Sequence, residues 1–444
     1  MRTISIPVLS ILKFIIITGI FIFISLDLLN SYQNLPLHWD EYLYVSRARF
    51  WDLYKNLDLK NKQFLSNDSY DSPKLPEYVY GIALNFSGHS NIEQYLRTLH
   101  FNNTFNNNPP AWYITATGEI IKLPKNVITR VEPILLARKA SLALALLSLL
   151  AIFIIGYLLE DWLLGIIQVL IFYSNPIFKI TMLRAMQESP LIFLLLIYFI
   201  FSLDIFKELN GKGYIQISKL IMLGILSGLL ISTKFTGIIS FFYFILALGM
   251  FFYLRYRSKA ALGKFLLIIM LYFLVSLSIF MILNPFTLFA PIKNTILIFY
   301  HSEHIRYLEM FNKYPTESLK TIQQRFYMVF ERTIAPNGVY ASFNIVIGIR
   351  DFLFYFLPLD IILFFSGIIV FVKHKFSKSR FYDLFFLLFL FCLIIPITLL
   401  IPMDWDRYYI LIILGASLVE GKALSYVIKN CYRQSLKMFT RSVG

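Results

Sequence analysis

Charged residues are scarce in this sequence. They make up 15% of the 444 residues, against roughly 25% in soluble domains. Hydrophobic residues make up 58%, and the mean hydropathy is +0.66. A soluble chain of this length would fold as roughly two or three domains, and so few charged residues could not cover their surfaces. The composition therefore excludes an ordinary soluble protein and predicts a chain that crosses a membrane several times.

Cysteine is scarce as well, with only two in the chain. Cys392 lies inside an apolar run and Cys431 in a basic segment, so we expect them at different depths. A disulfide framework is thereby excluded, and no spacing of Cys and His is typical of structural zinc. The first apolar run, 7–29, is too long for a signal peptide and lacks a small-residue cleavage site. We expect it to remain as the first span.

Acidic residues are fewer than basic ones: 26 Asp+Glu stand against 41 Lys+Arg, which gives a net charge of +15. Nucleic-acid binding would need those cations on the surface of a soluble module. Many of them lie instead in short runs between apolar segments, as in 255–264 and 373–380. Such runs mark the cytoplasmic side of a membrane protein, so we expect no nucleic-acid partner.

Long apolar runs are what the sequence has in quantity. About ten of them approach the roughly 20 residues that a spanning helix needs. They are 8–29, 134–158, 162–180, 189–204, 218–232, 238–254, 265–284, 352–372, 383–402 and 408–428. With a cytoplasmic N-terminus, the Lys/Arg-rich loops are cytoplasmic too. The sequence thus predicts an all-α polytopic membrane protein with about ten transmembrane helices, organised as one membrane domain (1–430) and a cytoplasmic basic tail (431–444).

The same orientation places two large loops and three short turns on the exterior side. In the first loop Tyr44, Ala48 and Trp51 follow one another at helical spacing, which predicts an amphipathic helix at the membrane surface. We therefore expect exterior loops that carry amphipathic helices, and every candidate site residue falls on this side. The exterior segments are 30–133, 181–188, 233–237, 285–350 and 403–407.

Two carboxylates, Asp40 and Glu41, stand near the start of the first exterior loop. Asp is a favoured helix cap and Glu suits the first helical turn, but a carboxylate at the membrane surface can also serve as a general base. Glu188 stands at the mouth of the fourth span, four residues after Arg184. The two would form a surface ion pair if the turn is helical, whereas a carboxylate at that depth needs a partner or a function. The sequence leaves these alternatives open.

Two cations stand at exterior ends of spans. Lys234 interrupts two apolar runs, either because it snorkels to the interface or because it meets a phosphate. Arg407 follows Asp406 in a stretch that looks like a metal-binding Asp-x-Asp motif, but on the wrong side for a cytosolic nucleotide. A helix cap at Asp406, with Arg407 facing headgroups, is the favoured interpretation there.

A cluster of polar residues lies in the second large loop, within a probable helix. Glu303 and His304 could bind a divalent metal, but the cluster contains no pair of His residues four positions apart. A solvated helix face is the alternative. The metal is left open, with Glu303 and His304 as its candidate ligands.

Taken in order, these motifs resemble the GT-C superfamily of integral-membrane glycosyltransferases, in particular the branch of protein O-mannosyltransferases and lipid A aminoarabinose transferases. The resemblance covers roughly 8–420. Glu188 departs from the pattern, since many relatives carry Asp there, and Ala111 stands where Leu is common. The matching stretches are Asp40-Glu41, Pro109-Pro110 with the aromatics that follow, Arg184 with Glu188, Thr233-Lys234, Glu303-His304-Ile305-Arg306 and Arg407-Tyr408.

The resemblance implies transfer of a sugar from a polyprenyl-phosphate-linked donor to a lipid, glycan or protein acceptor on the periplasmic or luminal side, with inversion. The sequons at Asn67, Asn85 and Asn102 arise readily in an Asn-rich chain, so we expect a bacterial inner membrane, or the endoplasmic reticulum membrane if the organism is a eukaryote. A phosphate leaving group needs cations more than it needs a general acid. The implied catalytic residues are Asp40 as base with Glu41 and Glu188 around the sugar and acceptor. The implied phosphate- and sugar-binding residues are Arg184, Lys234, His304, Arg306 and Arg407.

A transporter or lipid flippase is the competing hypothesis. Such proteins place polar residues near the bilayer midplane on broken helices and show two related halves. No related halves are visible in the sequence, and the polar candidates gather on one side. Gly224 and Gly228 form a small-xxx-small pattern that we expect to serve helix packing inside the protein.

Overall fold

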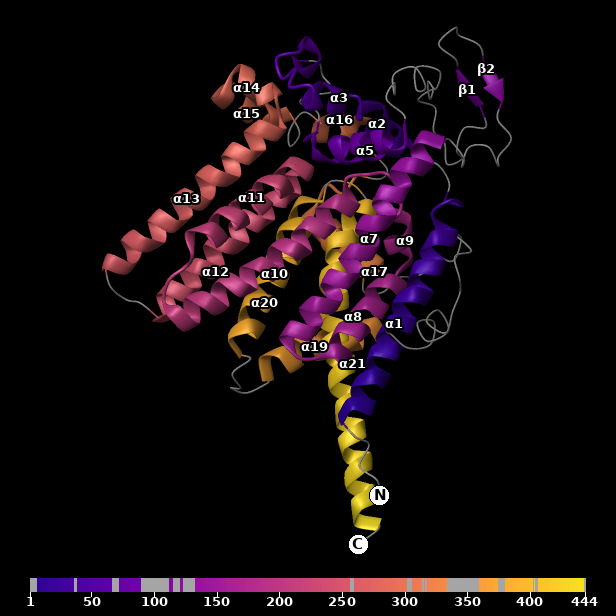
Figure 1. The fold of residues 1–444 in the computed structure, drawn as a ribbon, viewed down its shortest axis with the longest axis vertical. Coiled ribbons are helices and arrows are strands. Elements are labelled where there is room, and N and C mark those ends of the chain that lie inside the picture. Colours follow the sequence, from indigo (N-terminus) through magenta and orange to yellow (C-terminus); the bar gives the residue numbers. More distant parts are fainter. Residues whose placement is uncertain are drawn as a thin grey trace.

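The protein is a bundle of helices in the computed structural model (Figure 1). Its strands, in the part of the chain that is described, are β1 (Trp112–Ile114) and β2 (Ile120–Lys122), an antiparallel pair with Tyr113 opposite Ile121. Apart from this short pair, the described elements are helices, which confirms the predicted all-α polytopic architecture. The structure describes residues 6–35, 38–65, 72–88, 112–114, 120–122, 132–255, 259–301, 306–313, 315, 318–333, 359–373, 380–401, 403 and 406–442.

Ten apolar helices of the described chain coincide with the ten predicted spans. Six contain a stretch long and apolar enough to cross a membrane, and four are shorter. The six are α1 (Ile6–Ser31), α7 (Glu132–Leu159), α10 (Glu188–Lys212), α12 (Ile239–Arg255), α13 (Lys259–Leu283) and α21 (Asp406–Ser442). The shorter ones are α8 (Trp162–Ser174), α11 (Ile217–Thr233), α19 (Leu359–Lys373) and α20 (Arg380–Leu400).

The remaining described helices are short and lie between the apolar ones. Figure 1 shows α2, α3, α5, α14, α15 and α16 grouped at one end of the bundle and both termini at the opposite end. We call the end that carries this group of short helices the loop end. The short helices of the described chain, at the loop end and elsewhere, are α2 (Trp39–Arg47), α3 (Phe50–Lys55), η1 (Lys62–Leu65), α5 (Leu75–Phe86), α9 (Pro176–Met182), η2 (Phe235–Ile238), α14 (Phe286–Phe289), α15 (Pro291–Tyr300), α16 (Arg306–Lys313) and α17 (Ile322–Thr333).

Local sequence determines several helix boundaries. Asp161 caps α8, because its carboxylate accepts the backbone N–H groups of Leu163 and Leu164, each at 3.1 Å. Asn175 caps α9, and Pro176 follows at the first helical position, where its missing N–H costs nothing. Gly213 ends α10 at φ +77°, a left-handed conformation that favours glycine.

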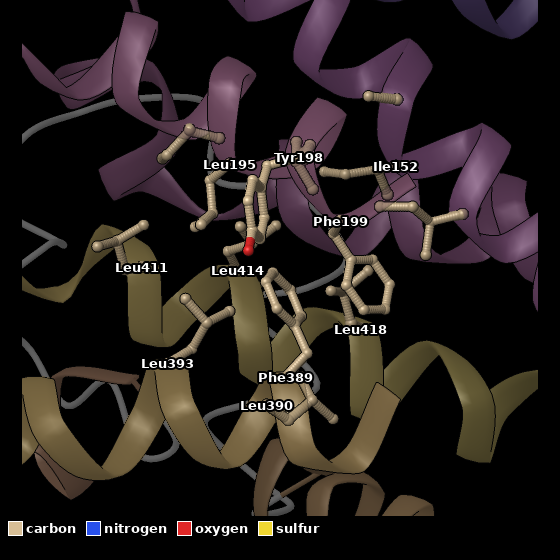
Figure 2. Close-up of a cluster of buried hydrophobic side chains, with 14 of the residues drawn as sticks. Ile152, Leu195, Tyr198, Phe199, Phe389, Leu390, Leu393, Leu411, Leu414 and Leu418 are labelled. Atoms are coloured by element: carbon tan, nitrogen blue, oxygen red, sulfur yellow. The ribbon is translucent and has the colours of Figure 1, made fainter. Parts of the chain in front are cut away.

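Helix α21 runs through the centre of the bundle, whereas α1 and α13 lie at its periphery. Of the most apolar stretch in each helix, 83% is buried in α21, 11% in α1 and 17% in α13. Figure 2 shows side chains of α10, α20 and α21 interdigitated in the core. Phe199 of α10 stacks on Phe389 of α20 with ring centroids 4.1 Å apart. The exposed apolar faces of α1 and α13 therefore face lipid.

Close helix approach depends on glycine at a few positions. A Cβ on Gly224 would lie 2.9 Å from the Val275 side chain, and one on Gly228 would lie 2.6 Å from that of Ile279. Both neighbours belong to α13, so the Gly224/Gly228 pattern packs α11 against α13 inside the chain, as we expected.

The amphipathic helix predicted through Tyr44, Ala48 and Trp51 is divided in the structure: α2 ends at Arg47 with Ala48 as its cap residue, and Trp51 lies in α3. Tyr44 and Val45 of α2, with the cap residue Ala48, are buried against residues of α5 and α7. Its apolar face thus packs against protein rather than lipid, and this packing holds the start of the helix over the loop end of the bundle.

Candidate functional site

The first turn of α2 is held by His38 rather than by Asp40. The His38 Nδ1 atom accepts the backbone N–H of Asp40 at 3.2 Å, and the Glu41 carboxylate accepts the backbone N–H of His38 at 3.0 Å. This reciprocal arrangement is a capping box with His38 as the cap residue. The alternative in which Asp40 caps the helix is therefore wrong, and its carboxylate is available for another purpose.

The Glu41 carboxylate is buried and saturated with hydrogen bonds. Its Oε1 accepts from Arg138 Nε at 2.7 Å and from the Ala185 backbone at 3.0 Å. Its Oε2 accepts from Arg138 Nη2 at 2.7 Å and from the His38 backbone at 3.0 Å. These four donors come from three segments of the chain, so Glu41 joins α2, α7 and the turn before α10.

Arg138, which the sequence analysis did not single out, is the partner of Glu41. Its side chain is fully buried in α7, and its Nη1 also donates to the carbonyls of Tyr32 at 3.1 Å and Leu35 at 2.8 Å. A bidentate Arg–carboxylate pair with satisfied neighbours is among the stronger polar contacts in a protein. An arginine inside the apolar run 134–158 was the available signal, because ionisable residues within spans are rare and usually have a role.

Asp40 forms an ion pair with Arg407, a residue 367 positions later in the chain. Both side chains are at most 9% exposed. The His38 Nδ1 atom lies 3.7 Å from the same Asp40 oxygen. The structure thus brings together the first carboxylate and the last cation that the sequence analysis selected.

Glu188 pairs with Lys234, with 3.0 Å between Oε1 and Nζ. The turn between Leu183 and Gln187 consists of bends, and Glu188 begins α10, so the helical Arg184–Glu188 pair expected from spacing does not form. Lys234 caps the C-terminal end of α11 in an extended conformation. Among the described residues, nothing donates to the buried Oε2 of Glu188. That oxygen therefore has unused hydrogen-bonding capacity.

The ring of Tyr408 connects the two ion pairs. Lys234 Nζ lies 5.2 Å from its centroid and Arg407 Cζ lies 5.3 Å from it. Both distances are within the range of cation–π contacts. Two cations and two carboxylates from the starts of α2, α10 and α21 and the end of α11 therefore meet around one aromatic ring.

Burial in the site, and three arginines near it, lower the pKa of His38. Desolvation lowers the pKa of His38 well below its ordinary value of 6.5, and the charges of Arg184, Arg407 and Arg138 lower it further. The imidazole is neutral at pH 7, and since its Nδ1 accepts a hydrogen bond, Nε2 carries the proton. Arg184 thus acts on the site through its charge. The cations Lys234 and Arg407 are the groups of this site that could bind an anionic ligand.

A second buried network supports the turn that carries Lys234. Lys74 Nζ lies 3.1 Å from the Glu77 carboxylate, and the Lys74 backbone donates to Asn284 Oδ1 at 3.1 Å. Asn284 in turn donates to Ser232 Oγ at 3.2 Å. These contacts link α5 to the end of α13 and to Ser232 near the end of α11. Ser232 lies two residues before Lys234. Asn284 is the last residue of the predicted span 265–284, and nothing in the sequence pattern singled it out.

Some predicted residues lie outside the described residues. These include Glu303, His304 and the Pro109-Pro110 stretch, while Arg306 begins α16 with its side chain not described. In the described part of the chain, no three His, Cys, Asp or Glu side chains gather as a metal site. The metal ligands and the contributions of His304 and Arg306 therefore stay predictions.

Solved structures with the same fold include ArnT and AglB. ArnT from Cupriavidus metallidurans, bound to undecaprenyl phosphate, matches with a TM-score of 0.55 and 12% identity, over 92% of this chain and 60% of that one. AglB from Archaeoglobus fulgidus, an archaeal oligosaccharyltransferase in complex with an inhibitory peptide and a dolichol-phosphate, matches with a TM-score of 0.51 and 12% identity, over 95% and 51%. Both are GT-C glycosyltransferases. This chain has a GT-C fold.

A further structure of the Archaeoglobus fulgidus oligosaccharyltransferase, with Zn and sulfate, supports the same fold. Its TM-score is 0.53 at 14% identity, over 96% of this chain and 51% of that chain. The GT-C-like architecture expected from the sequence is confirmed, and the chain spans only about half to three fifths of the length of these proteins. No family model and no curated protein matches the sequence.

Proposed function

We propose that this GT-C-fold protein is a membrane glycosyltransferase that moves a sugar from a polyprenyl-phosphate-linked donor to an acceptor at the loop end, which faces the exterior. One observation carries the proposal: Asp40, Glu188, Lys234 and Arg407 meet around Tyr408 although they are far apart in the sequence. A base and two cations are what transfer from a phosphate leaving group requires.

In this proposal Lys234 and Arg407 bind the donor phosphate. The phosphate gains negative charge as the bond to the sugar breaks, and prearranged cations stabilise that charge. Bound undecaprenyl phosphate in ArnT and bound dolichol-phosphate in AglB support the choice of donor. The unpartnered Oε2 of buried Glu188 is suited to accept a hydroxyl of the sugar.

Asp40 is the general base for the acceptor hydroxyl. In the free protein its carboxylate is paired with Arg407, which weakens it as a base. A donor phosphate competes for Arg407, and the carboxylate that loses its partner becomes more basic. The acceptor oxygen then attacks the anomeric carbon, its proton passes to Asp40, and the C–O electron pair leaves with the phosphate. Attack opposite the leaving group inverts the anomeric centre.

Glu41 has a positioning role in this scheme. All of its hydrogen-bonding capacity is used by Arg138, Ala185 and His38, so it holds Asp40 and the Arg184 turn in place. The resemblance implies that His304 or Arg306 of the second large loop closes over the donor. The sugar is a hexose or pentose, and the membrane is a bacterial inner membrane, or that of the endoplasmic reticulum in a eukaryote.

The proposal is tested with the full chain purified in detergent. Mass spectrometry of the co-purifying lipid should identify a polyprenyl phosphate or its glycosylated form, and proteoliposomes loaded with that donor should transfer its sugar. A flippase would bind and translocate the lipid while leaving its sugar–phosphate bond intact. Translocation without cleavage would refute the transferase proposal, as would a protein that binds no polyprenyl phosphate at all.

A further inference from the structure

A carboxylate that the proposed site does not use lies within the apolar helix α1. The Tyr173 hydroxyl donates to Oδ2 of Asp27, and Lys179 Nζ lies 2.6 Å from the same oxygen. Lys179 Nζ is also 5.4 Å from the centroid of the Tyr173 ring, within the range of cation–π contacts. We call these three side chains the clasp. Because an ionisable residue within an apolar span is costly, such a residue usually has a function.

The clasp joins α1 to the junction of α8 and α9. Tyr173 lies in the last turn of α8 and Lys179 in α9, and Asn175 between them caps α9 by accepting a backbone N–H at 3.0 Å. The side chains of Ile24 and Leu28, in the same half of α1, are buried. Apolar packing is non-directional, whereas hydrogen bonds have a defined geometry. The clasp therefore determines the rotation and the axial position of α1 against the bundle.

On one side of the clasp, α1 leads to Arg138. Five and eight residues after Asp27, the carbonyls of Tyr32 and Leu35 accept from Arg138 Nη1 at 3.1 Å and 2.8 Å. Arg138 in turn binds both oxygens of the Glu41 carboxylate. A displaced α1 would withdraw the two carbonyls and leave a buried guanidinium with fewer acceptors, which costs free energy. The position of α1 therefore affects how Arg138 holds Glu41.

On the other side of the clasp, α9 leads to a second donor for Glu41. The Leu183 backbone ends α9 by donating to the Lys179 carbonyl at 3.3 Å. Two residues later, the Ala185 backbone donates to Glu41 Oε1 at 3.0 Å. One support of Glu41 is thus braced by α1 and the other follows α9, and the clasp ties these two segments together.

We propose that Asp27, Tyr173 and Lys179 are positioning residues for the start of α2. By fixing α1 against the α8–α9 junction, they keep the two supports of Glu41 in place relative to each other. Glu41 in turn holds the neighbouring Asp40 in the site. The effect on sugar transfer rests on the proposed function, whereas the effect on the order of α2 is independent of it.

Hydrogen–deuterium exchange of the full chain in lipid nanodiscs tests the proposal with a matched control. Asp27→Asn removes the charge of a carboxylate that is 25% exposed and leaves Lys179 without its ion pair. Glu160→Gln does the same at the opposite end of α7, where a carboxylate that is 30% exposed lies 2.7 Å from Lys422 Nζ. Tyr173→Phe is a milder second variant, which removes one donor to Asp27 and keeps both charges of the clasp.

Amide exchange within 38–47 should accelerate about two- to thirtyfold in Asp27→Asn, the range over which distant residues of one network shift such equilibria. Tyr173→Phe should show a smaller acceleration, and Glu160→Gln should leave this segment at the wild-type rate. Single-turnover transfer by Asp27→Asn should slow by a similar factor. Donor affinity should change less, because Lys234 is held at the end of α11.

Two results would overturn the proposal. Unchanged exchange within 38–47 would show that the clasp acts on α1 alone, and equal acceleration in Glu160→Gln would show a general loss of stability. If Asp27→Asn does not fold, Tyr173→Phe carries the same comparison. A wild-type protein without transfer activity would refute the proposed function, while the exchange rates would still decide whether the clasp positions α2.

Discussion

Lys234 has two roles in the proposed site, and a double-mutant cycle separates them. Its Nζ lies 3.0 Å from Oε1 of Glu188, whose side chain is 1% exposed. Lys234→Met alone would leave this carboxylate buried without a cation. Breaking one half of a buried pair costs about 3–5 kcal/mol, so we expect a clear loss of stability in the single variant before any question of catalysis arises.

Adding Glu188→Gln to Lys234→Met removes the uncompensated charge. The double variant should regain most of the lost stability, because a neutral amide needs no counter-ion in this environment. Transfer should not return with it, because the phosphate has lost its own cation. A charge-assisted contact contributes about 1.5–3 kcal/mol, so the double variant should be about ten- to a hundredfold slower than Glu188→Gln alone.

The assay compares all four proteins of the cycle. Apparent melting temperatures in detergent report stability, and single-turnover transfer in proteoliposomes reports catalysis, where the loss should exceed the loss in donor affinity. If the double variant transfers sugar as fast as Glu188→Gln alone, Lys234 is only the counter-ion of Glu188 and the phosphate assignment is refuted. Equal stability of wild type and Lys234→Met would refute the ion pair itself.

Three further predictions follow from the same contacts. Asp40→Asn leaves the His38 cap untouched, so the helix should persist while transfer falls by about 10²–10⁴; donor affinity measured in parallel should not fall, because Arg407 is released for the phosphate. Arg138→Leu leaves buried Glu41 without its cation and should lower the free energy of unfolding by about 3–5 kcal/mol. A variant as stable as the wild type would contradict the Glu41–Arg138 ion pair. Folding lowers the pKa of His38. As the pH falls below about 6.5, the imidazole is therefore protonated in the unfolded chain while it stays neutral in the folded chain. Stability should therefore decrease in that direction, and His38→Gln should remove this component of the pH dependence.

The membrane fold is a strongly local property of this sequence. Every described apolar helix coincides with an apolar run that hydropathy alone selects, from α1 to α21. The reason is physical: backbone N–H and C=O groups in lipid must be satisfied within the segment itself, so an apolar run of sufficient length becomes a helix whatever surrounds it. Helix ends follow local rules too, as at Asp161 and Gly213.

The individual motifs were also visible, but their partners were not. Asp40, Glu188, Lys234 and Arg407 could be selected because charge at a membrane boundary is costly and therefore informative. Spacing suggested the pair Arg184–Glu188, whereas the structure pairs Glu188 with Lys234, 46 positions away.

What the sequence determined by itself is the set of spans and the residue types available at one end of the bundle, since hydropathy and charge act through the local solvent. Only the tertiary structure decided which charges meet. The packing of α2 over α7 turned Glu41 toward Arg138 and left Asp40 to Arg407. This pairing depends on how helices up to 367 positions apart in the chain pack against one another. The free energy of that packing cannot be read from a local sequence pattern.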